Sequence, residues 1–205
     1  MTSSPPSLWS IHEMDGRLAR GARARATIVD ALFALIEEGD LRPSAARIAE
    51  RAGVSLRSVF QHFKDVESLF AALADRQRER LAPLAGRVAA DGPLSKRLDA
   101  FVATRARLLD AIAPVRRAAL LMEPFSHELG TRLAAFRRLK AEEVRRVFAP
   151  ELARRSPVTR RRLLAALVAS SSWNTWQALR EHQGLSRGEA RHVLRHTLGA
   201  LLEAR

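Results

Sequence analysis

Apolar residues recur at helical spacing in the first part of the chain. The clearest run extends from Ala24 to Glu38, where the apolar residues share one face, as in an amphipathic helix packed on a core. Gly39 follows directly, and glycine favours the left-handed backbone that ends many helices. The apolar face consists of Ile28, Ala31, Leu32 and Leu35. We therefore predict a first helix over residues 24–38, preceded by a flexible arm over residues 1–16.

Three further helices are predicted before residue 85. Two are short and lie at about Ser44–Ala52 and Ser55–Phe63. A longer one runs from Asp65 to about Leu84, and its first half repeats apolar residues at helical spacing: Val66, Leu69, Phe70 and Leu73. The stretch from Ala85 to Pro93 has no such pattern, so we expect it to be a joint between two parts of the chain.

Proline and glycine divide the remaining sequence. Proline interrupts helical hydrogen bonding and glycine favours turns, so both are expected at helix boundaries. The dividing residues are Pro114, Pro124, Pro150, Pro157 and Gly184. The predicted helical segments are 94–113, 115–123, 126–148, 157–182 and 186–204. No stretch alternates apolar and polar residues for long, and the predicted fold class is therefore all-α.

The stretch from Ser44 to Phe63 has the pattern of two helices joined by a tight turn. Ser44 and Ser55 are suited to cap the two helices, because a serine oxygen accepts a hydrogen bond from a backbone N–H. Gly53 is expected to adopt the positive φ that turns the chain. The inward-facing residues are Ile48, Ala49, Val54, Val59 and Phe63. This arrangement is typical of a helix-turn-helix, whose second helix reads the major groove of DNA with its amino-terminal residues.

The inward positions leave a defined set of residues for DNA. Arg57 could pair with O6 and N7 of guanine, Gln61 could read adenine or bond to phosphate, and Ser58 is short enough for either role. His62 and Lys64 follow at the end of the second helix, where contacts to the DNA backbone are expected. The complete set of candidate DNA-binding residues is Ser44, Arg47, Ser55, Leu56, Arg57, Ser58, Phe60, Gln61, His62 and Lys64. Arg17, Arg20 and Arg23 are equally compatible with a minor-groove arm and with a solvated tail.

The segment IAERAGVSLRSVFQHFKDVESLF resembles the signature of the tetracycline-repressor (TetR) family. The matching residues are Arg25, Ile28, Ile48, Ala49, Ala52, Gly53, Val54, Ser55, His62, Phe63, Glu67 and Leu69, within residues 25–70. Two positions depart from the family pattern. Phe60 replaces the usual tyrosine and Val66 the usual lysine, and both groups commonly contact the DNA backbone in the family. Lys64 is a possible substitute for one of them.

The resemblance implies a fold, a function and a division of the chain. It implies an N-terminal three-helix helix-turn-helix domain at residues 17–70, with a linking helix at 65–84, and a ligand-binding and dimerisation domain at 85–205. The expected partners are a double-stranded palindromic DNA operator, a small-molecule effector that releases it, and a second copy of the chain. The dimer is expected through the helices at 157–182 and 186–204. The apolar residues available there are Leu163, Leu164, Leu167, Val168, Val193, Leu194, Leu198, Leu201 and Leu202, which could instead form an intramolecular core.

Candidate effector contacts are aromatic and apolar residues with a few polar groups, the composition typical of small-molecule pockets. They are Phe101, Arg105, Leu109, Met122, Phe125, Phe136, Trp173, Asn174 and Trp176. Few acidic residues accompany them, which disfavours a polycationic ligand. Each of these residues is also compatible with an ordinary core or surface position.

Composition narrows the remaining possibilities. The formal net charge is +13 at pH 7, but most of the surplus lies beyond residue 64, so bulk charge adds little to the argument for DNA. The chain has no cysteine, which excludes disulfides and fits a cytoplasmic protein. No signal peptide or membrane-spanning segment is evident. His192 and His196 are one helical turn apart, a spacing that can bind a metal, but no third ligand accompanies them, and no cofactor is expected.

Two alternatives remain open at this stage. One is a TetR-like regulator whose C-terminal domain only dimerises and has no small-molecule effector; the departures at Phe60 and Val66 keep it open. The other is an all-helical enzyme. The sequence contains no Gly-x-Ser-x-Gly, no phosphate-binding glycine loop and no His-Glu-x-x-His motif, so we predict a non-enzymatic protein.

Overall fold

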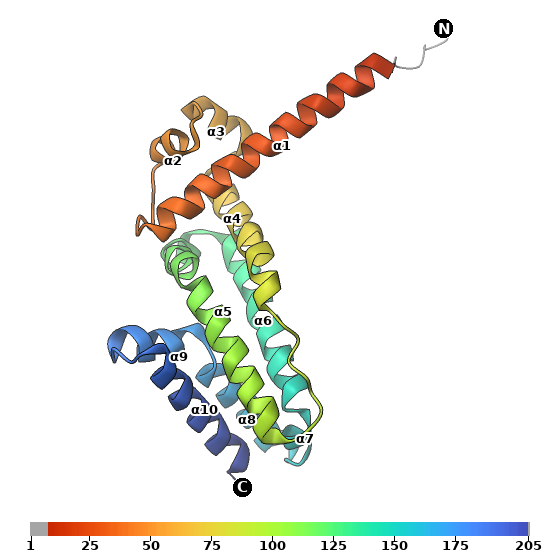
Figure 1. Ribbon diagram of the computed structural model, residues 1–205, viewed down its shortest axis with the longest axis vertical. Coiled ribbons are helices and arrows are strands. Elements are labelled where there is room, and N and C mark those ends of the chain that lie inside the picture. Colours follow the sequence, from red (N-terminus) through yellow and green to blue (C-terminus); the bar gives the residue numbers. More distant parts are fainter. Residues whose placement is uncertain (1–7, 205) are drawn as a thin grey trace. The chain divides into compact units, whose positions relative to one another are not determined.

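The computed structural model describes residues 8–204, which form helices joined by turns and loops, with no strand among them (Figure 1). The prediction of an all-α fold is therefore confirmed. The helices of the first part are α1 (Leu8–Glu37), α2 (Ala45–Ala52), α3 (Leu56–His62), α4 (Val66–Leu81) and the short η1 (Ala82–Leu84). Those of the second part are α5 (Leu94–Met122), η2 (Glu123–Phe125), α6 (His127–Val147), α7 (Ala149–Ala153), α8 (Pro157–Ser170), α9 (Trp173–Gln177), η3 (Ala178–His182) and α10 (Arg187–Glu203).

Helix α1 begins much earlier than the sequence pattern predicted. Its first residue is Leu8 rather than Ala24, so residues 8–16, expected to form a flexible arm, are helical. The prediction followed the buried face, which starts at Ile28. Residues 17–26, which precede that face, are rich in alanine and arginine, which favour helix without needing a core. Residues 1–7 of the expected arm lie outside the described residues.

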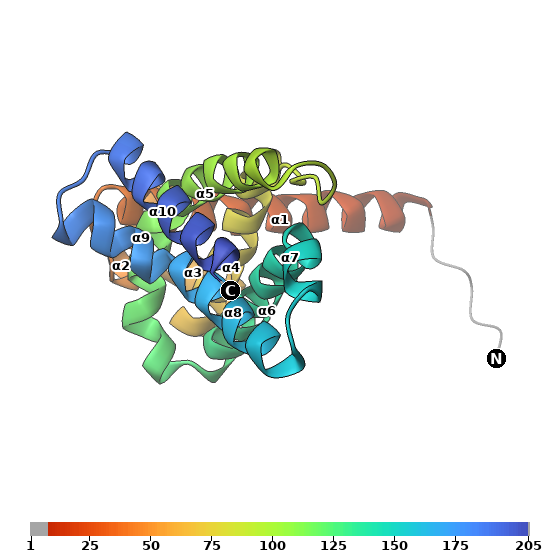
Figure 2. The ribbon, with the colours of Figure 1, turned by 90° about the horizontal axis from the view of Figure 1, so that it is seen from below.

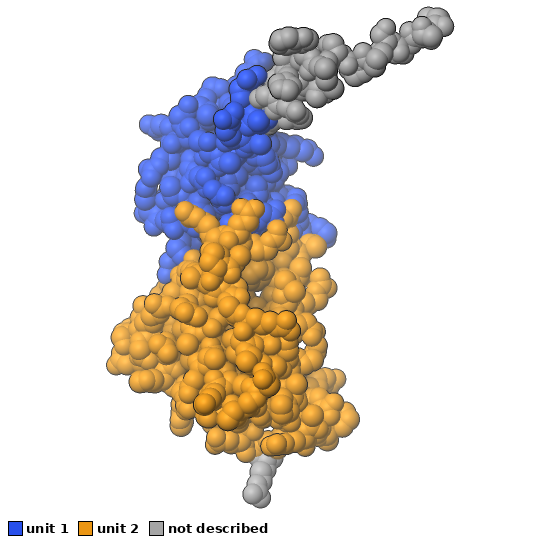
Figure 3. All heavy atoms as spheres, turned by 45° about the vertical axis from the view of Figure 1, so that its right-hand side comes forward, with its two compact units in different colours: residues 1–76, 114–129 blue, residues 77–113, 130–205 orange. Residues whose placement is uncertain are grey.

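The chain divides into two compact units, and the division is not a single cut (Figure 3). Unit 1 contains residues 1–76 together with 114–129, and unit 2 contains residues 77–113 and 130–205. The boundaries expected from the sequence were linear. The difference arises because the C-terminal turns of α5 and the first turn of α6 belong to unit 1.

The core of unit 1 is built by α1–α4 and the last turns of α5. Ile28, Leu32 and Ile36 of α1 are almost fully buried. They pack in one cluster with residues of the other helices, including Ile48, Val59, Phe63, Leu69, Leu73, Val115 and Ala118. A two-pronged ion pair joins α1 to α4: Nε and Nη2 of Arg76 lie 2.9 and 3.0 Å from the carboxylate oxygens of Asp30. Segments far apart in sequence thus hold the short helices α2 and α3 in place.

Helix α5 runs through Pro114, where the sequence predicted a break between residues 113 and 115. Proline lacks an N–H, so the carbonyl of Asp110 loses its helical partner there. Packing on both sides outweighs this loss. Ile112 and Val115, next to the proline, are both buried, as are Ala118 and Ala119 further along. The expectation that Pro114 would end the helix was wrong, because tertiary packing stabilises the helix on both sides of it.

The predicted helix at 157–182 is also interrupted, although no proline lies within it. Helix α8 ends at Ser170, α9 begins at Trp173, and residues 178–182 form a π-helical turn, η3. Serine side chains make the break favourable. Ser171 Oγ donates to the carbonyl of Leu167 at 2.7 Å, and Ser172 caps α9 by accepting from the N–H of Thr175 at 3.3 Å. Serine competes with the backbone in this way and so favours caps over helix interiors.

Helices α8 and α10 of unit 2 lie side by side (Figures 1 and 2). Five leucines of the two helices are buried: Leu163, Leu167, Leu194, Leu198 and Leu202. Helix α10 begins with a capping box, in which Ser186 and Glu189 bond to each other's backbone N–H. The bond from Ser186 also holds the pKa of Glu189 below its usual value.

Candidate DNA-binding surface and effector residues

The turn between α2 and α3 has the geometry that the sequence predicted. Ser44 and Ser55 cap the two helices, accepting hydrogen bonds from the N–H groups of Arg47 at 3.3 Å and Ser58 at 3.1 Å. Gly53 adopts a φ of 65°, and its N–H bonds to the last carbonyls of α2. A side chain at this position would be strained because left-handed backbone suits glycine. The local sequence therefore fixes where α3 starts and in which direction it leaves α2.

Helix α3 presents its amino-terminal residues outward. Leu56 is 44% exposed, and Arg57 and Gln61 are also exposed. Ser58 is half-buried, while Val59 and Phe63 turn into the core. One face of this seven-residue helix thus anchors it, and the other is available to a ligand.

Arg25 of α1 fastens the C-terminal end of α3. Its guanidinium lies 4.3 Å from the ring centre of Phe63 and donates from Nη1 to the carbonyl of His62 at 3.1 Å. Both contacts fall where a helix ends with free carbonyls and a partial negative charge. The sequence comparison marked Arg25 only as a matching residue; its position in the structure gives it this supporting role.

The remaining candidate DNA-binding residues lie around α2 and α3 on the outside of unit 1. Arg47 is exposed and pairs with Asp40 at 3.3 Å, an exposed pair that gives little stability and can exchange partners. His62 is half-buried and Lys64 is exposed. Phe60 is 52% exposed, so the position that departs from the family pattern faces outward. Val66, the second departure, is also exposed at the first turn of α4.

The start of α4 is held by polar contacts that the sequence did not predict. Asp65 accepts from the N–H of Ser68 at 2.7 Å, and this bond lowers the pKa of Asp65. Glu67 accepts from the hydroxyl of Ser126 at 2.5 Å and from the N–H of Glu128 at 3.1 Å. Ser126 immediately precedes α6, so Glu67 ties the first turn of α4 to the first turn of α6. Both ends belong to unit 1.

Three candidate effector residues from α5 are buried in unit 2. Phe101 and Leu109 are apolar core residues, and the Phe101 ring packs edge-on against Phe148 with the ring centres 5.2 Å apart. Arg105, between them, has a side chain that is only 3% exposed. Its Nη2 donates to Oε2 of Glu143 at 2.7 Å, and its guanidinium carbon lies 4.7 Å from the ring centre of Phe101. Burial lowers the pKa of Arg105, although the charge of Glu143 opposes the shift.

The other candidate effector residues have mixed surroundings. Phe125 is 78% exposed, and Phe136 is exposed beside the ammonium of Lys140. Asn174 is exposed too. Met122 is half-buried and packs on the core of unit 1. None of these four lies in the buried interior of unit 2 with Phe101, Arg105 and Leu109.

Trp173 and Trp176 of α9 are buried in unit 2. The indole N–H of Trp176 donates to Asp110 at 2.6 Å, and the other carboxylate oxygen of Asp110 pairs with Nε of Arg187 at 2.9 Å. Sequence analysis missed Asp110 and Glu143 because their roles depend on partners from distant helices. A lone acidic residue in a helical pattern reads as a surface position.

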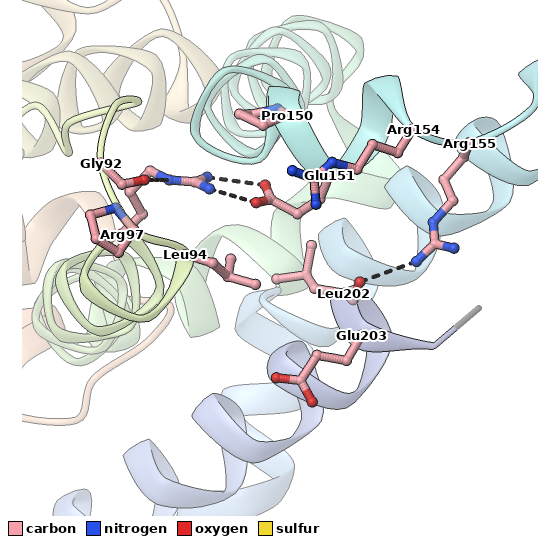
Figure 4. A pocket seen from close by; sticks show the side chains of 10 residues that line it. Gly92, Leu94, Arg97, Pro150, Glu151, Arg154, Arg155, Leu202 and Glu203 are labelled. Carbon is pink, nitrogen blue, oxygen red and sulfur yellow. Dashed lines mark hydrogen bonds and ion pairs between the residues drawn. The ribbon is translucent and has the colours of Figure 1, made fainter.

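Unit 2 also carries an open groove of about 530 Å³, lined by residues of the 92–97 segment, of α7 and its C-terminal flank, and of the end of α10 (Figure 4). Three of its charged side chains, Arg97, Glu151 and Arg155, already have partners. Arg97 pairs with Glu151 at 2.5 Å, and Arg155 donates to the carbonyl of Leu202 at 3.2 Å. Burial raises the pKa of Glu151, but the hydrogen bonds and charge of Arg97 outweigh it and hold that pKa below its usual value. This groove stabilises the fold and presents few free groups to a ligand.

Comparisons with known proteins agree with this picture. Residues 28–73 match the bacterial regulatory proteins of the tetR family. A candidate transcriptional regulator from Pseudomonas aeruginosa PAO1 is similar in structure, with a TM-score of 0.65 and 19% identity over 88% of this chain and 90% of that one. A candidate TetR-family transcriptional regulator from Mesorhizobium loti MAFF303099 has a TM-score of 0.62 and 20% identity over 89% of this chain and 96% of that one. A search of curated proteins found no match.

No helix among the described residues is long and apolar enough to cross a membrane. The match at residues 28–73 contains α2, α3 and the first half of α4, and it lies entirely within unit 1. It therefore covers the residues whose caps, turn and exposed face have just been described. Residues 28–73 therefore match the tetR family of bacterial regulatory proteins in sequence, and most of the chain shares the fold of the two similar structures.

Proposed function

We propose that the protein is a transcriptional repressor that binds a palindromic operator as a homodimer and leaves it when a small molecule binds. The observation that carries the proposal is the outward-facing amino-terminal end of α3 within a tetR-family domain. A helix held in this way can enter the major groove, where Arg57 would reach base edges. Ser44, Arg47, Ser55, Leu56, Ser58, Phe60, Gln61, His62 and Lys64 would supply the surrounding contacts.

Dimerisation is supported by the outer faces of α8 and α10. The five buried leucines of the two helices are already covered within the chain, but Val158 and Val193 remain exposed. Small residues accompany them on the surface: Ala165 and Ala169 on α8, and Ala200 on α10. Small and branched apolar side chains allow helices to approach closely, as in a four-helix interface. Two recognition helices would then read two half-sites, which a single short helix cannot do.

Release by an effector is supported by two features: the buried guanidinium of Arg105 in unit 2, and the three helices that contribute residues to both units. Arg105 lies among apolar residues, the composition expected of a small-molecule site. Helices α4, α5 and α6 each contribute residues to both units. A ligand that binds more tightly to an arrangement of these helices unsuited to the operator would lower the affinity for DNA. The factor would equal the one by which DNA lowers the affinity for the ligand. We propose that no catalysis is involved.

Binding to DNA upstream of the chain's own coding sequence tests the proposal. We expect a gel-shift complex at moderate salt that unlabelled promoter DNA displaces and random DNA of equal length does not. Non-specific binding weakens steeply with salt, so the comparison should be repeated at two salt concentrations. Equal displacement by promoter and random DNA would contradict sequence-specific regulation.

Arg57→Ala should relax base preference at one position of each half-site. The expected cost is about 1–3 kcal/mol if the contact to guanine is bidentate. The measurement is binding to a set of operators that differ at single positions. Glu50→Ala, an exposed change on α2 that leaves α3 intact, is the matched control. An unchanged preference profile for the Arg57 variant would mean that this side chain does not read a base.

A further inference from the structure

The buried guanidinium of Arg105 has most of its hydrogen-bonding capacity unused. A guanidinium carries five N–H donors. Among the residues that the structure describes, Arg105 makes one hydrogen bond, from Nη2 to Glu143. Its side chain is nevertheless 3% exposed, and buried donors in proteins nearly always have a partner. The remaining donors are not fully enclosed, since Gln77 Oε1 is the one fully buried side-chain atom without a partner among the described residues, and they can therefore bind an acceptor that this chain does not supply.

Arg97, in the same unit, shows what a structural buried arginine looks like in this protein (Figure 4). Its Nε donates to the carbonyl of Gly92 at 3.0 Å, its Nη1 to Val147 at 2.5 Å, and its Nη2 to Glu151 at 2.5 Å. All three nitrogens are thus engaged by the protein. The two arginines are equally buried, so burial alone does not explain why Arg105 has a single hydrogen bond.

The surroundings of Arg105 favour an anionic, partly apolar partner. Phe101 lies against the guanidinium and Leu109 is fully buried one turn further along α5. Glu143 is partly exposed, and solvent screens the charge of its carboxylate. It therefore neutralises the buried guanidinium of Arg105 only in part. A carboxylate can accept two parallel N–H bonds from a guanidinium, a geometry that a single water molecule cannot supply.

A second polar group with an unused hydrogen-bonding atom packs against the same helix from α4. Gln77 of α4 is buried, and its Nε2 donates to the carbonyl of Ala111 at 3.0 Å. Its Oε1 is buried without a hydrogen-bond partner. Ala111 is six residues beyond Arg105, about 9 Å along the axis of α5. Unit 2 therefore offers unused donors at one point of α5 and an unused acceptor near another.

We infer that Arg105 binds the carboxylate of an apolar organic acid, and that this acid is the class of effector. The inference rests on the proposed function for its regulatory meaning, but the binding site stands on the geometry of Arg105 alone. The acid's apolar part would lie among Phe101, Leu109 and their neighbours. A hydroxyl or amine on that part would satisfy Gln77 Oε1.

Thermal unfolding of the full chain with paired probes tests the binding. The probes are benzoate with benzamide, and octanoate with octanamide, each pair sharing shape and differing in charge. We expect at least one acid to raise the melting temperature while its amide does not. Arg105→Gln should lower the affinity for that acid about tenfold or more, and Arg105→Lys should lower it less. Arg138→Gln, an exposed arginine on α6, is the matched control and should bind as the unaltered chain does.

Glu143→Gln keeps the inference testable if the Arg105 variants fold poorly. Removing the carboxylate that competes for Arg105 should strengthen binding of the acid severalfold. Equal stabilisation by an acid and its amide would overturn the inference, as would undiminished acid binding by Arg105→Gln. Failure of both acids to stabilise the unaltered chain and Glu143→Gln would overturn it as well.

Operator binding separates this inference from the proposed function. If both hold, the acid that stabilises the chain releases promoter DNA in a gel shift, and Arg105→Gln binds the DNA but resists release. Specific DNA binding without any acid binding would overturn the inference and leave the repressor proposal intact. Acid binding by a chain that does not distinguish promoter from random DNA would overturn the repressor proposal and leave the Arg105 site intact.

Discussion

Phe60 lies on the exposed surface of α3, at a position where a single hydroxyl group is expected to affect DNA binding. Its ring is 52% exposed beside residues proposed to contact DNA. An apolar ring at this place lies against water in the free protein and offers nothing to a phosphate. Tyrosine, the usual residue at this position of the family pattern, differs from phenylalanine by one hydroxyl, which can donate a hydrogen bond to a phosphate oxygen.

Phe60→Tyr should therefore tighten DNA binding without changing sequence preference. The added contact is to the backbone, so the gain should be similar for operator and random DNA, at about 0.5–1.5 kcal/mol, the net value of one hydrogen bond. Binding curves on both kinds of DNA measure it. Phe136→Tyr adds the same hydroxyl to an exposed ring of unit 2 and should leave both curves unchanged. A gain restricted to one operator would contradict a phosphate contact.

Glu67 links two helices through their first turns. Its carboxylate accepts from the buried hydroxyl of Ser126 and from the N–H of Glu128. A negative charge is favourable at the N-terminus of α6, where several backbone N–H groups have no helical partner. The residue belongs to the family pattern, and its contact with α6 gives that pattern a physical reason.

Glu67→Ala should lower the free energy of unfolding by about 1–3 kcal/mol, because it leaves the hydroxyl of Ser126 without its charged acceptor. Urea unfolding followed by circular dichroism measures the change. Glu50→Ala removes an exposed carboxylate from the same unit and should shift the midpoint little. If both variants unfold at the same urea concentration, the contact contributes nothing to stability.

The sequence predicted elements well where local chemistry determines them. The caps at Ser44 and Ser55 and the turn at Gly53 are local, and the structure confirms all three. The start of α1, the passage of α5 through Pro114 and the break at Ser171 were predicted wrongly, because each depends on packing or on competing side-chain bonds. Candidate effector residues were chosen by residue type, which cannot tell buried Phe101 from exposed Phe125.

At the scale of the whole molecule, the buried pair of Arg97 and Glu151 holds α5 against α7. Both side chains are almost fully buried, and Arg97 also bonds to two backbone carbonyls. Removing one member of such a pair leaves an uncompensated buried charge. The cost is therefore larger than the net contribution of the intact pair.

Glu151→Ala should lower the free energy of unfolding by about 3–5 kcal/mol at neutral pH. Because the folded-state pKa of Glu151 is lowered, its contribution is present above the unfolded-state pKa, about 4.3, and is lost as the pH falls through the folded-state value. The stability difference between the variant and the unaltered chain should thus shrink below about pH 4. Glu203→Ala, an exposed carboxylate in the same groove, should show no such difference.

Val193→Arg should weaken the proposed dimer while leaving the fold intact. Val193 is 40% exposed on α10, so the arginine faces solvent in the isolated chain, whereas two of them would crowd an interface across a two-fold axis. Light scattering should show a lower mass than for the unaltered chain, and operator affinity should fall with it. Ala89→Arg, on an exposed loop, is the control for added charge. Equal masses for the two variants would place the interface elsewhere.

The interleaving of the two units has a consequence for anyone who would recombine this regulator with another. Residues 1–76 are not self-sufficient, since Val115 and Ala118 close one wall of their core and Ser126 satisfies Glu67. A chimera that exchanged only residues 1–76 would pack the core residues of one parent against the other parent's residues at positions 115 and 118. Residues 114–129 have to be transplanted with it, so exchanging the proposed DNA-binding unit requires two matched pieces of gene.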